Sequence, residues 1–120
     1  MLPLPDDKAK RLECYGNALR NWNYQGYVRF KPLAQEWIAN ELPEYSLMDI
    51  AREFAVFVVR GGLIDERKER RPEYTHHEYH YDLRLNLGGR YVYFETILII
   101  AKDANDPDDP VIVVVNAHDV

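Results

Sequence analysis

The segment from Tyr79 to Ile100, YHYDLRLNLGGRYVYFETILII, decides the fold that the rest of the sequence predicts. Apolar and polar residues alternate on both sides of Gly88-Gly89. A two-residue glycine connection between alternating runs is typical of a β-hairpin. If the two glycines form the turn, Leu87 pairs with Arg90, and this pair sets the register of both strands.

This register predicts one apolar and one polar face. The apolar face carries these cross-strand pairs: Leu85 with Val92, Leu83 with Phe94, Tyr81 with Thr96, and Tyr79 with Leu98. The polar face carries Asn86 with Tyr91, Arg84 with Tyr93, Asp82 with Glu95, and His80 with Ile97. We therefore expect the apolar face to lie against helices and to form the core.

Composition places the chain among globular proteins. It has 120 residues, the size of a single domain (1-120), and 47% of them are hydrophobic. The net charge is -5, with three Lys/Arg against eight Asp/Glu after residue 75. This balance counts against non-specific binding of nucleic acid. Cys14 is the only cysteine, which excludes an intrachain disulfide. Without an apolar signal core or a long apolar run, we expect a cytoplasmic protein with no membrane partner.

Three helices are predicted before the hairpin. Asp6 or Asp7 caps the first, which begins near Lys8. Pro32 suits the first turn of the second, which ends at Pro43. The third spans residues 47–60, with a capping box formed by Ser46 and Asp49 and with Gly61-Gly62 after its end. Helical spacing gives each helix an apolar stripe: Leu12, Tyr15, Leu19 and Trp22; Leu33, Trp37, Ile38 and Leu42; Ile50, Phe54, Phe57 and Val58.

The remaining segments complete an α+β architecture. Residues 27–30 are short and extended. Residues 63–71 are dense in charge and predict either an edge strand or a helix. Residues 111–118, VIVVVNAH, have the β-branched composition of a central strand. We expect two to three N-terminal helices packed on one face of a three- to four-stranded antiparallel sheet.

The polar face of the hairpin holds the candidate chemistry. Asp82 opposite Glu95 places two carboxylates across a strand pair, where they repel. We expect Arg84 and Arg90 to neutralise them on a face open to water. His80 shares the face, and His118 is expected on the same side of its strand as Ile112, Val114 and Asn116. Tyr91 and Tyr93 are candidates for stacking on bases.

Neither the histidines nor the acidic loop predicts a metal site. The four histidines, at positions 76, 77, 80 and 118, lack a known ligand spacing. The loop from Asp103 to Asp109 lacks the glycine and the distal glutamate of a calcium-binding loop. We expect no metal and no cofactor.

About half of the chain resembles a known fold. Three segments together resemble the RelE-like toxins. They are a helix that ends at a glycine and leads into Ile-Asp-Glu (47–66), the run Gly-Arg-x-Val-x-Phe (89–94) and the strand 111–117. These belong to the barnase/EndoU/colicin/RelE class, which includes the BrnT and MqsR toxins. The chain departs from this pattern at Pro32, where relatives often have a histidine, and in its acidic charge.

The resemblance implies a metal-independent endoribonuclease, the toxin of a toxin–antitoxin pair. Such domains cut RNA on the open sheet face, where the ribose 2′-hydroxyl attacks the adjacent phosphate. The implied partners are an RNA substrate and an antitoxin protein. The implied catalytic residues are His80, Arg84, Arg90, Tyr93 and His118, and the implied binding residues are Asp82, Tyr91, Glu95 and Asn116. The alternative is a non-catalytic protein-interaction module on the same scaffold.

Overall fold

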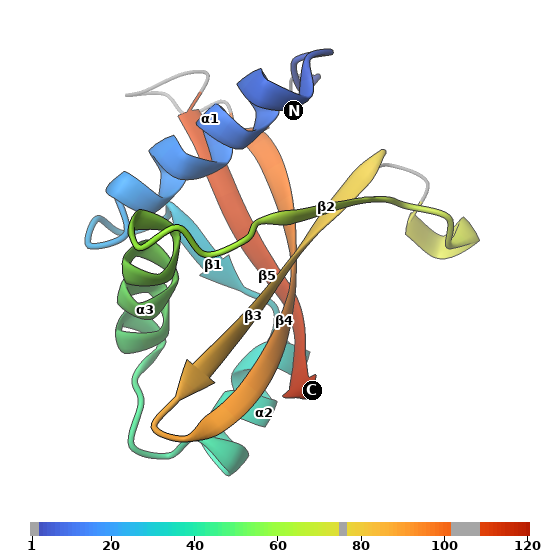
Figure 1. Ribbon diagram of the computed structural model, residues 1–120. Helices are drawn as coiled ribbons and strands as arrows, with labels where there is room; N and C mark the ends of the chain where they lie inside the picture. Colours follow the sequence, from blue (N-terminus) through green and yellow to red (C-terminus); the bar gives the residue numbers. More distant parts are fainter. Residues whose placement is uncertain (1–2, 75–76, 102–108) are drawn as a thin grey trace.

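The computed structural model describes residues 3–74, 77–101 and 109–120 and has an α+β fold (Figure 1). Its helices are α1 (Lys8–Arg20), α2 (Pro32–Glu41) and α3 (Leu47–Val59), with a short 3₁₀ turn, η1 (Pro72–Tyr74). Its strands are β1 (Val28–Phe30), β2 (Asp65–Lys68), β3 (Tyr79–Leu87), β4 (Arg90–Ala101) and β5 (Asp109–Asp119). No helix in the described part of the chain is long and apolar enough to cross a membrane.

The sheet confirms the predicted fold class and adds an unforeseen parallel pair. The strand order is β1-β5-β4-β3-β2. β1 runs parallel to β5, and the other neighbouring strands are antiparallel. The sheet therefore has five strands, because β1 forms one edge and β2 the other, with β3, β4 and β5 between them. It is mixed, because β1 is parallel to its neighbour.

The predicted turn sets the hairpin register. Gly88 and Gly89 have φ values of 61° and 93°, and this left-handed conformation at both positions defines a tight hairpin turn. The β3–β4 ladder then runs from Leu87–Arg90 to Tyr81–Thr96, as predicted. It stops short of the two outermost predicted pairs, Tyr79–Leu98 and His80–Ile97.

The core lies between the helices and the apolar face of the sheet. Phe94 is fully buried, and its ring meets that of Phe54 edge to face at 4.9 Å. Phe57 and Val58 pack against the same cluster, as expected, although both are only half-buried. The predicted burial of the four hairpin residues is confirmed: Leu83, Leu85, Val92 and Phe94. Burying each large side chain stabilises the fold by about 1.5–3 kcal/mol.

The helix boundaries follow the signals in the sequence. Asp7 accepts a hydrogen bond from the Ala9 N–H at the start of α1. Ser46 and Asp49 form both bonds of the capping box that begins α3. The predicted stripe of α2 is wrong at Leu33, which is 60% exposed, whereas Ala34 takes the buried position.

Part of the charged segment 63–71 forms an edge strand, β2, which is one of its two predicted alternatives. β2 pairs with Tyr79–Asp82 of β3. A buried ion pair fixes it to α1, since Arg11 Nε lies 2.9 Å from Glu66 Oε2. Arg11 donates two hydrogen bonds to this carboxylate and Tyr81 donates a third. The hydrogen bond from Arg11 lowers the pKa of Glu66.

A β-bulge corrects the predicted facing of β5. The β4–β5 register shifts between Glu95 and Thr96, so that Asn116 pairs with Glu95 while Val114 pairs with Thr96. The extra residue, Val115, reverses the alternation of side chains along the strand. Ile112 and Val114 therefore belong to the buried core, whereas Asn116 and His118 lie on the open face, and their predicted common face is wrong.

Candidate functional site

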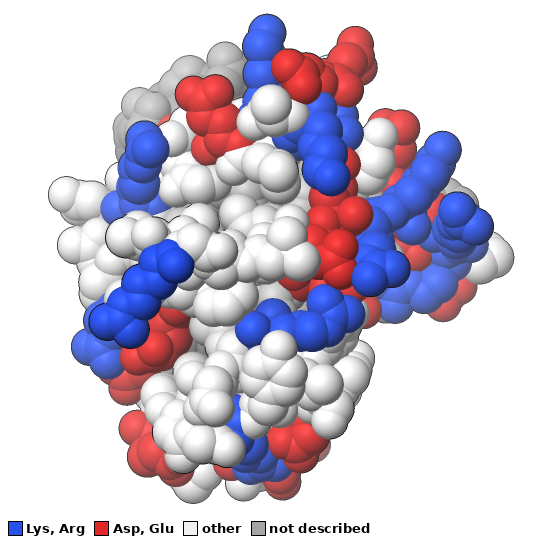
Figure 2. Space-filling view, viewed as in Figure 1, with Lys and Arg blue, Asp and Glu red and all other residues white. Residues whose placement is uncertain are grey.

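The open face of the sheet carries a polar hollow with a volume of about 530 Å³. It lies where β2 and the residues after it border β3 and β4. In Figure 2, Lys and Arg side chains gather with acidic ones at the right of the view, where β2 and η1 lie. The hollow is lined by Arg67, Lys68, Glu69, Arg70, Arg71, His80, Asp82, Arg84 and Tyr93.

The pairing of Asp82 with Glu95 is confirmed, but its expected exposure is wrong. The two residues are only 5% and 6% exposed. Arg84 Nη2 lies 3.8 Å from Asp82 Oδ2, as one of the predicted bridges. Glu95 is neutralised instead by Arg71, which donates from both Nη atoms. Arginine therefore balances both carboxylates, although one of the two arginines was not foreseen.

Glu69 connects this pair to His80. Its carboxylate is almost fully buried and accepts hydrogen bonds from the side chain and the backbone of Arg71. The Arg71 guanidinium lowers the pKa of Glu69 to about 2. His80 Nδ1 lies 3.2 Å from Glu69 Oε2, but not in hydrogen-bond alignment, and His80 Nε2 lies 3.7 Å from Asp82 Oδ1. The His80 ring thus stands between two carboxylates.

Tyr93 joins the hollow to the final strand. Its hydroxyl donates a 2.7 Å hydrogen bond to Asp82 Oδ1, and its ring stacks on His118 with 4.5 Å between the ring centres. The Arg84 guanidinium lies 5.3 Å from the centre of the same ring. Burial and the bond to Asp82 raise the pKa of Tyr93 far above neutral. Tyr93 is therefore a hydrogen-bond donor and not a base near neutral pH.

Arg90 lies apart from this group, so its predicted place on the open face is wrong. It pairs with Leu87 and therefore shares the alternation of the apolar face. Its guanidinium binds Asp119 and Glu41 at 2.6–2.8 Å and lies 5.2 Å from the centre of the Trp37 ring. Arg90 thus connects the end of the sheet to α2.

The predicted binding residues separate into three places. Asp82 lines the hollow, whereas Tyr91 lines a groove beside α3. Glu95 and Asn116 line a neighbouring depression, together with Arg71 and Lys31. His76 and the loop residues 103–108 lie outside the described residues. Of the predicted catalytic residues, the structure brings together His80, Arg84 and Tyr93, with His118 stacked beside them.

Sequence reasoning missed Glu69 and Arg71, which hold the hollow together. Both come from the irregular segment between β2 and η1, where no periodicity relates a residue to a face. The only available signal was the charge density of residues 65–71. Within the described residues, no group of three or more His, Cys, Asp or Glu side chains is placed to hold a metal ion.

Comparison with known proteins adds no relative: the chain matches no known family, no curated protein and no solved structure. Function must therefore be argued from the chemistry of the site.

Proposed function

We propose that the chain is a metal-independent endoribonuclease of the RelE-like type, acting as the toxin of a toxin–antitoxin pair in the cytoplasm. The observation that carries the proposal is the charge of the hollow. Of the described residues, five cationic and two acidic side chains line it, and two more carboxylates, Asp65 and Glu95, bind these cations from its border, which leaves one positive charge in excess in a chain whose net charge is -5. A local cationic surface of this kind suits the phosphates of RNA.

Two of these cations are available to a ligand. Lys68 and Arg70 are exposed, and neither side chain forms an ion pair with a described residue. Arg67 and Arg84 are partly neutralised by Asp65, at 2.9 and 3.2 Å. Lys68 and Arg70 would therefore meet the phosphates first, and Arg84 would hold the scissile phosphate near His80.

The proton transfers fall to the two histidines. Cleavage requires a base that takes the proton of the 2′-hydroxyl and an acid that protonates the leaving 5′-oxygen. Histidine is the side chain best suited to both tasks near neutral pH. His80 lines the hollow, and His118 lies beside it, stacked on Tyr93, which is a lining residue. The exposed ring of Tyr91, which lies outside the hollow at the border of the neighbouring groove, would stack on an unpaired base, which favours a single-stranded substrate.

Expression in a bacterial host tests this proposal. The intact chain should arrest growth, and His80→Ala or His118→Ala should relieve the arrest at equal protein level. Arg84→Ala should relieve it as well, whereas Arg52→Ala, a matched change on the exposed side of α3, should not. Unaltered growth together with intact cellular RNA would reject the nuclease and favour the alternative, a protein-interaction module.

A further inference from the structure

One half of the outer edge of β3 has no neighbouring strand in the described parts of the chain. β2 pairs only with Tyr79–Asp82, so residues 83–87 have β4 on one side alone. The bond from Glu69 N–H to Glu78 C=O shows that even-numbered residues direct their backbone outward. The backbone groups of Arg84 and Asn86 therefore face away from β4, and no described residue takes a hydrogen bond from them or gives one to them. Each residue offers one N–H and one C=O.

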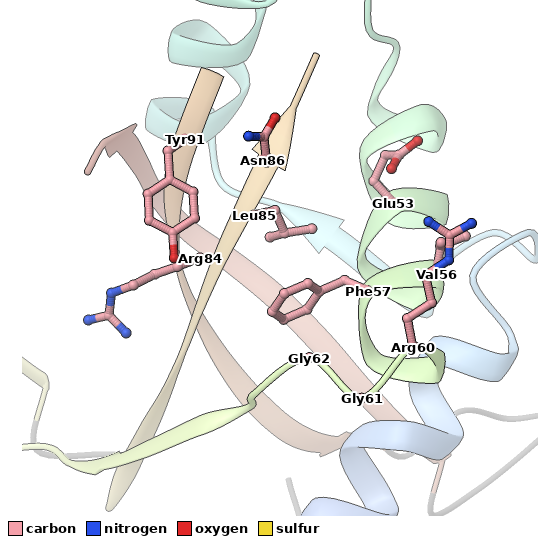
Figure 3. Close-up of a pocket in the computed structure, with 10 residues that line it drawn as sticks. All are labelled: Glu53, Val56, Phe57, Arg60, Gly61, Gly62, Arg84, Leu85, Asn86 and Tyr91. Carbon is pink, nitrogen blue, oxygen red and sulfur yellow. The ribbon is translucent and has the colours of Figure 1, made fainter. Parts of the chain in front are cut away.

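This free edge borders a groove of about 470 Å³ between β3 and the second half of α3. Figure 3 shows Phe57 pointing from α3 toward Leu85, with Gly61 and Gly62 below them. A Cβ at Gly62 would lie within 2.6 Å of the Phe57 ring, so glycine lets the ring fill the floor of the groove. The groove is lined by Glu53, Val56, Phe57, Arg60, Gly61, Gly62, Arg84, Leu85, Asn86 and Tyr91.

We propose that this groove binds an extended segment of a partner protein, which adds to β3 as a sixth strand and carries alternating apolar and acidic side chains. Free main-chain groups at a sheet edge are the basis of recognition by strand addition. Side chains of an added strand point alternately to the two faces of the sheet. One row would meet Leu85 and Phe57 and should be apolar. The other row would lie beside Arg84 and should be acidic.

The charges around the groove support an acidic partner. Arg84 stands on the open-face side of the free edge, and Arg60 lines the helix side without an ion pair to any described residue. Among the described residues, Glu53 is the only acidic one that lines the groove, and Arg52 lies 3.9 Å from its carboxylate. An acidic side chain opposite Arg84 would form a favourable cross-strand pair.

The same charges disfavour a second copy of this chain as the occupant. Pairing β3 with the β3 edge of another copy would bring the two Arg84 side chains onto one face within two residues of each other. Like charges in such positions destabilise a strand pair. The proposal does not rest on nuclease activity, because its tests measure peptide binding alone and, among the described residues, the linings of the groove and the hollow share only Arg84.

Fluorescence polarisation with short labelled peptides tests the proposal on the whole chain. A peptide of alternating valine and glutamate should bind about tenfold or more tightly than an isomer with the same residues in two blocks. Replacing Arg84 by glutamate should weaken this peptide about tenfold and favour its valine–lysine counterpart, so that the charge preference is exchanged. Lys68→Glu, a charge reversal in the hollow but outside the groove, at a side chain that forms no ion pair with a described residue, should leave both affinities unchanged.

Main-chain pairing has its own control. N-methylation of the peptide residues that face β3 should abolish binding, whereas methylation of the residues between them should not. On binding, the amides of Arg84 and Asn86 should become protected from hydrogen exchange. Equal binding of the block isomer, equal effects of both methylation patterns, or no binding of the alternating peptide would overturn the proposal. Dimerisation through β3 that the peptide does not displace would assign the edge to a second copy and overturn it as well.

Discussion

The two faces of the sheet are built from the same strands but use charge in opposite ways. On the helix side, Arg11 and Glu66 are buried, and each nitrogen of the Arg11 guanidinium donates to a partner: Nε and Nη2 to Glu66, and Nη1 to the carbonyl oxygens of Pro5 and Asp6. On the open side, His80 stands between two carboxylates with a ring nitrogen that has no aligned partner. A charge that serves folding is fully satisfied, whereas the open face retains polar groups that a ligand could use.

Truncation of one residue on each face should give the largest contrast. Phe94→Ala removes a fully buried ring that packs on Phe54, and it should lower the free energy of unfolding by about 3–5 kcal/mol. Tyr91→Ala, on the open face and 51% exposed, should lower it by less than about 1 kcal/mol. Chemical denaturation measures both values. Similar losses would mean that the two faces do not differ as described.

A second contrast concerns the two arginines. Arg11→Ala leaves the Glu66 carboxylate buried without its cation and should cost about 3 kcal/mol. Arg84→Ala removes two looser ion pairs of a partly exposed guanidinium, to Asp65 at 3.2 Å and to Asp82 at 3.8 Å, and because Asp82 keeps its hydrogen bond from Tyr93 the cost should be only about 1 kcal/mol. Urea melts of the two variants distinguish them. If the Arg84 variant were as unstable as the Arg11 variant, Arg84 would be needed for the stability of the fold, and this would weaken its proposed role in binding phosphate.

Acid should weaken the network of the open face through Glu69. The pKa of Glu69 is about 2 in the folded chain, below the ordinary glutamate value of about 4.3 in an unfolded chain. Its stabilising contribution is therefore complete above about pH 4.3 and is lost as the pH falls toward about 2. The melting temperature of Glu69→Gln should consequently depend less on pH across this window than that of the parent chain. Identical pH profiles would contradict the assignment.

The smallest effect is expected from Asp82→Asn. The amide oxygen can still accept the hydrogen bond of Tyr93, and the lost attraction to Arg84 is offset by the removed repulsion from Glu95. The free energy of unfolding should change by less than about 1 kcal/mol in either direction. Thermal melts at neutral pH check this value. A gain of several kcal/mol would show that the two carboxylates are retained at a cost to stability.

The fold was predictable where local chemistry determines it. Two glycines set the hairpin register, and the Ser46–Asp49 box set the start of α3. The bulge at Val115 was not predictable, because a run of valines fits either register equally well. The parallel pairing of β1 with β5 was missed as well, since a three-residue strand has no periodicity of its own.

The candidate site was predictable only along the hairpin. His80, Arg84 and Tyr93 follow from alternation alone, once the turn is known. The same alternation assigns Arg90 to the helix side of the sheet, where its ion pairs lie. The prediction of Arg90 on the open face was therefore inconsistent with the predicted register. Glu69 and Arg71 depend on the path of an irregular segment, which is set by tertiary contacts and not by any local pattern.

Cleavage of a short single-stranded RNA in the presence of a metal chelator tests the central claim most directly. The parent chain should cut the RNA and leave a 2′,3′-cyclic phosphate, while the all-deoxy counterpart, which lacks the attacking hydroxyl, should stay intact. His80→Ala, with its fold verified by circular dichroism, should cut the RNA about 10²–10⁴-fold more slowly. Intact RNA after prolonged incubation, or equal cleavage by the parent and the variant, would contradict the account.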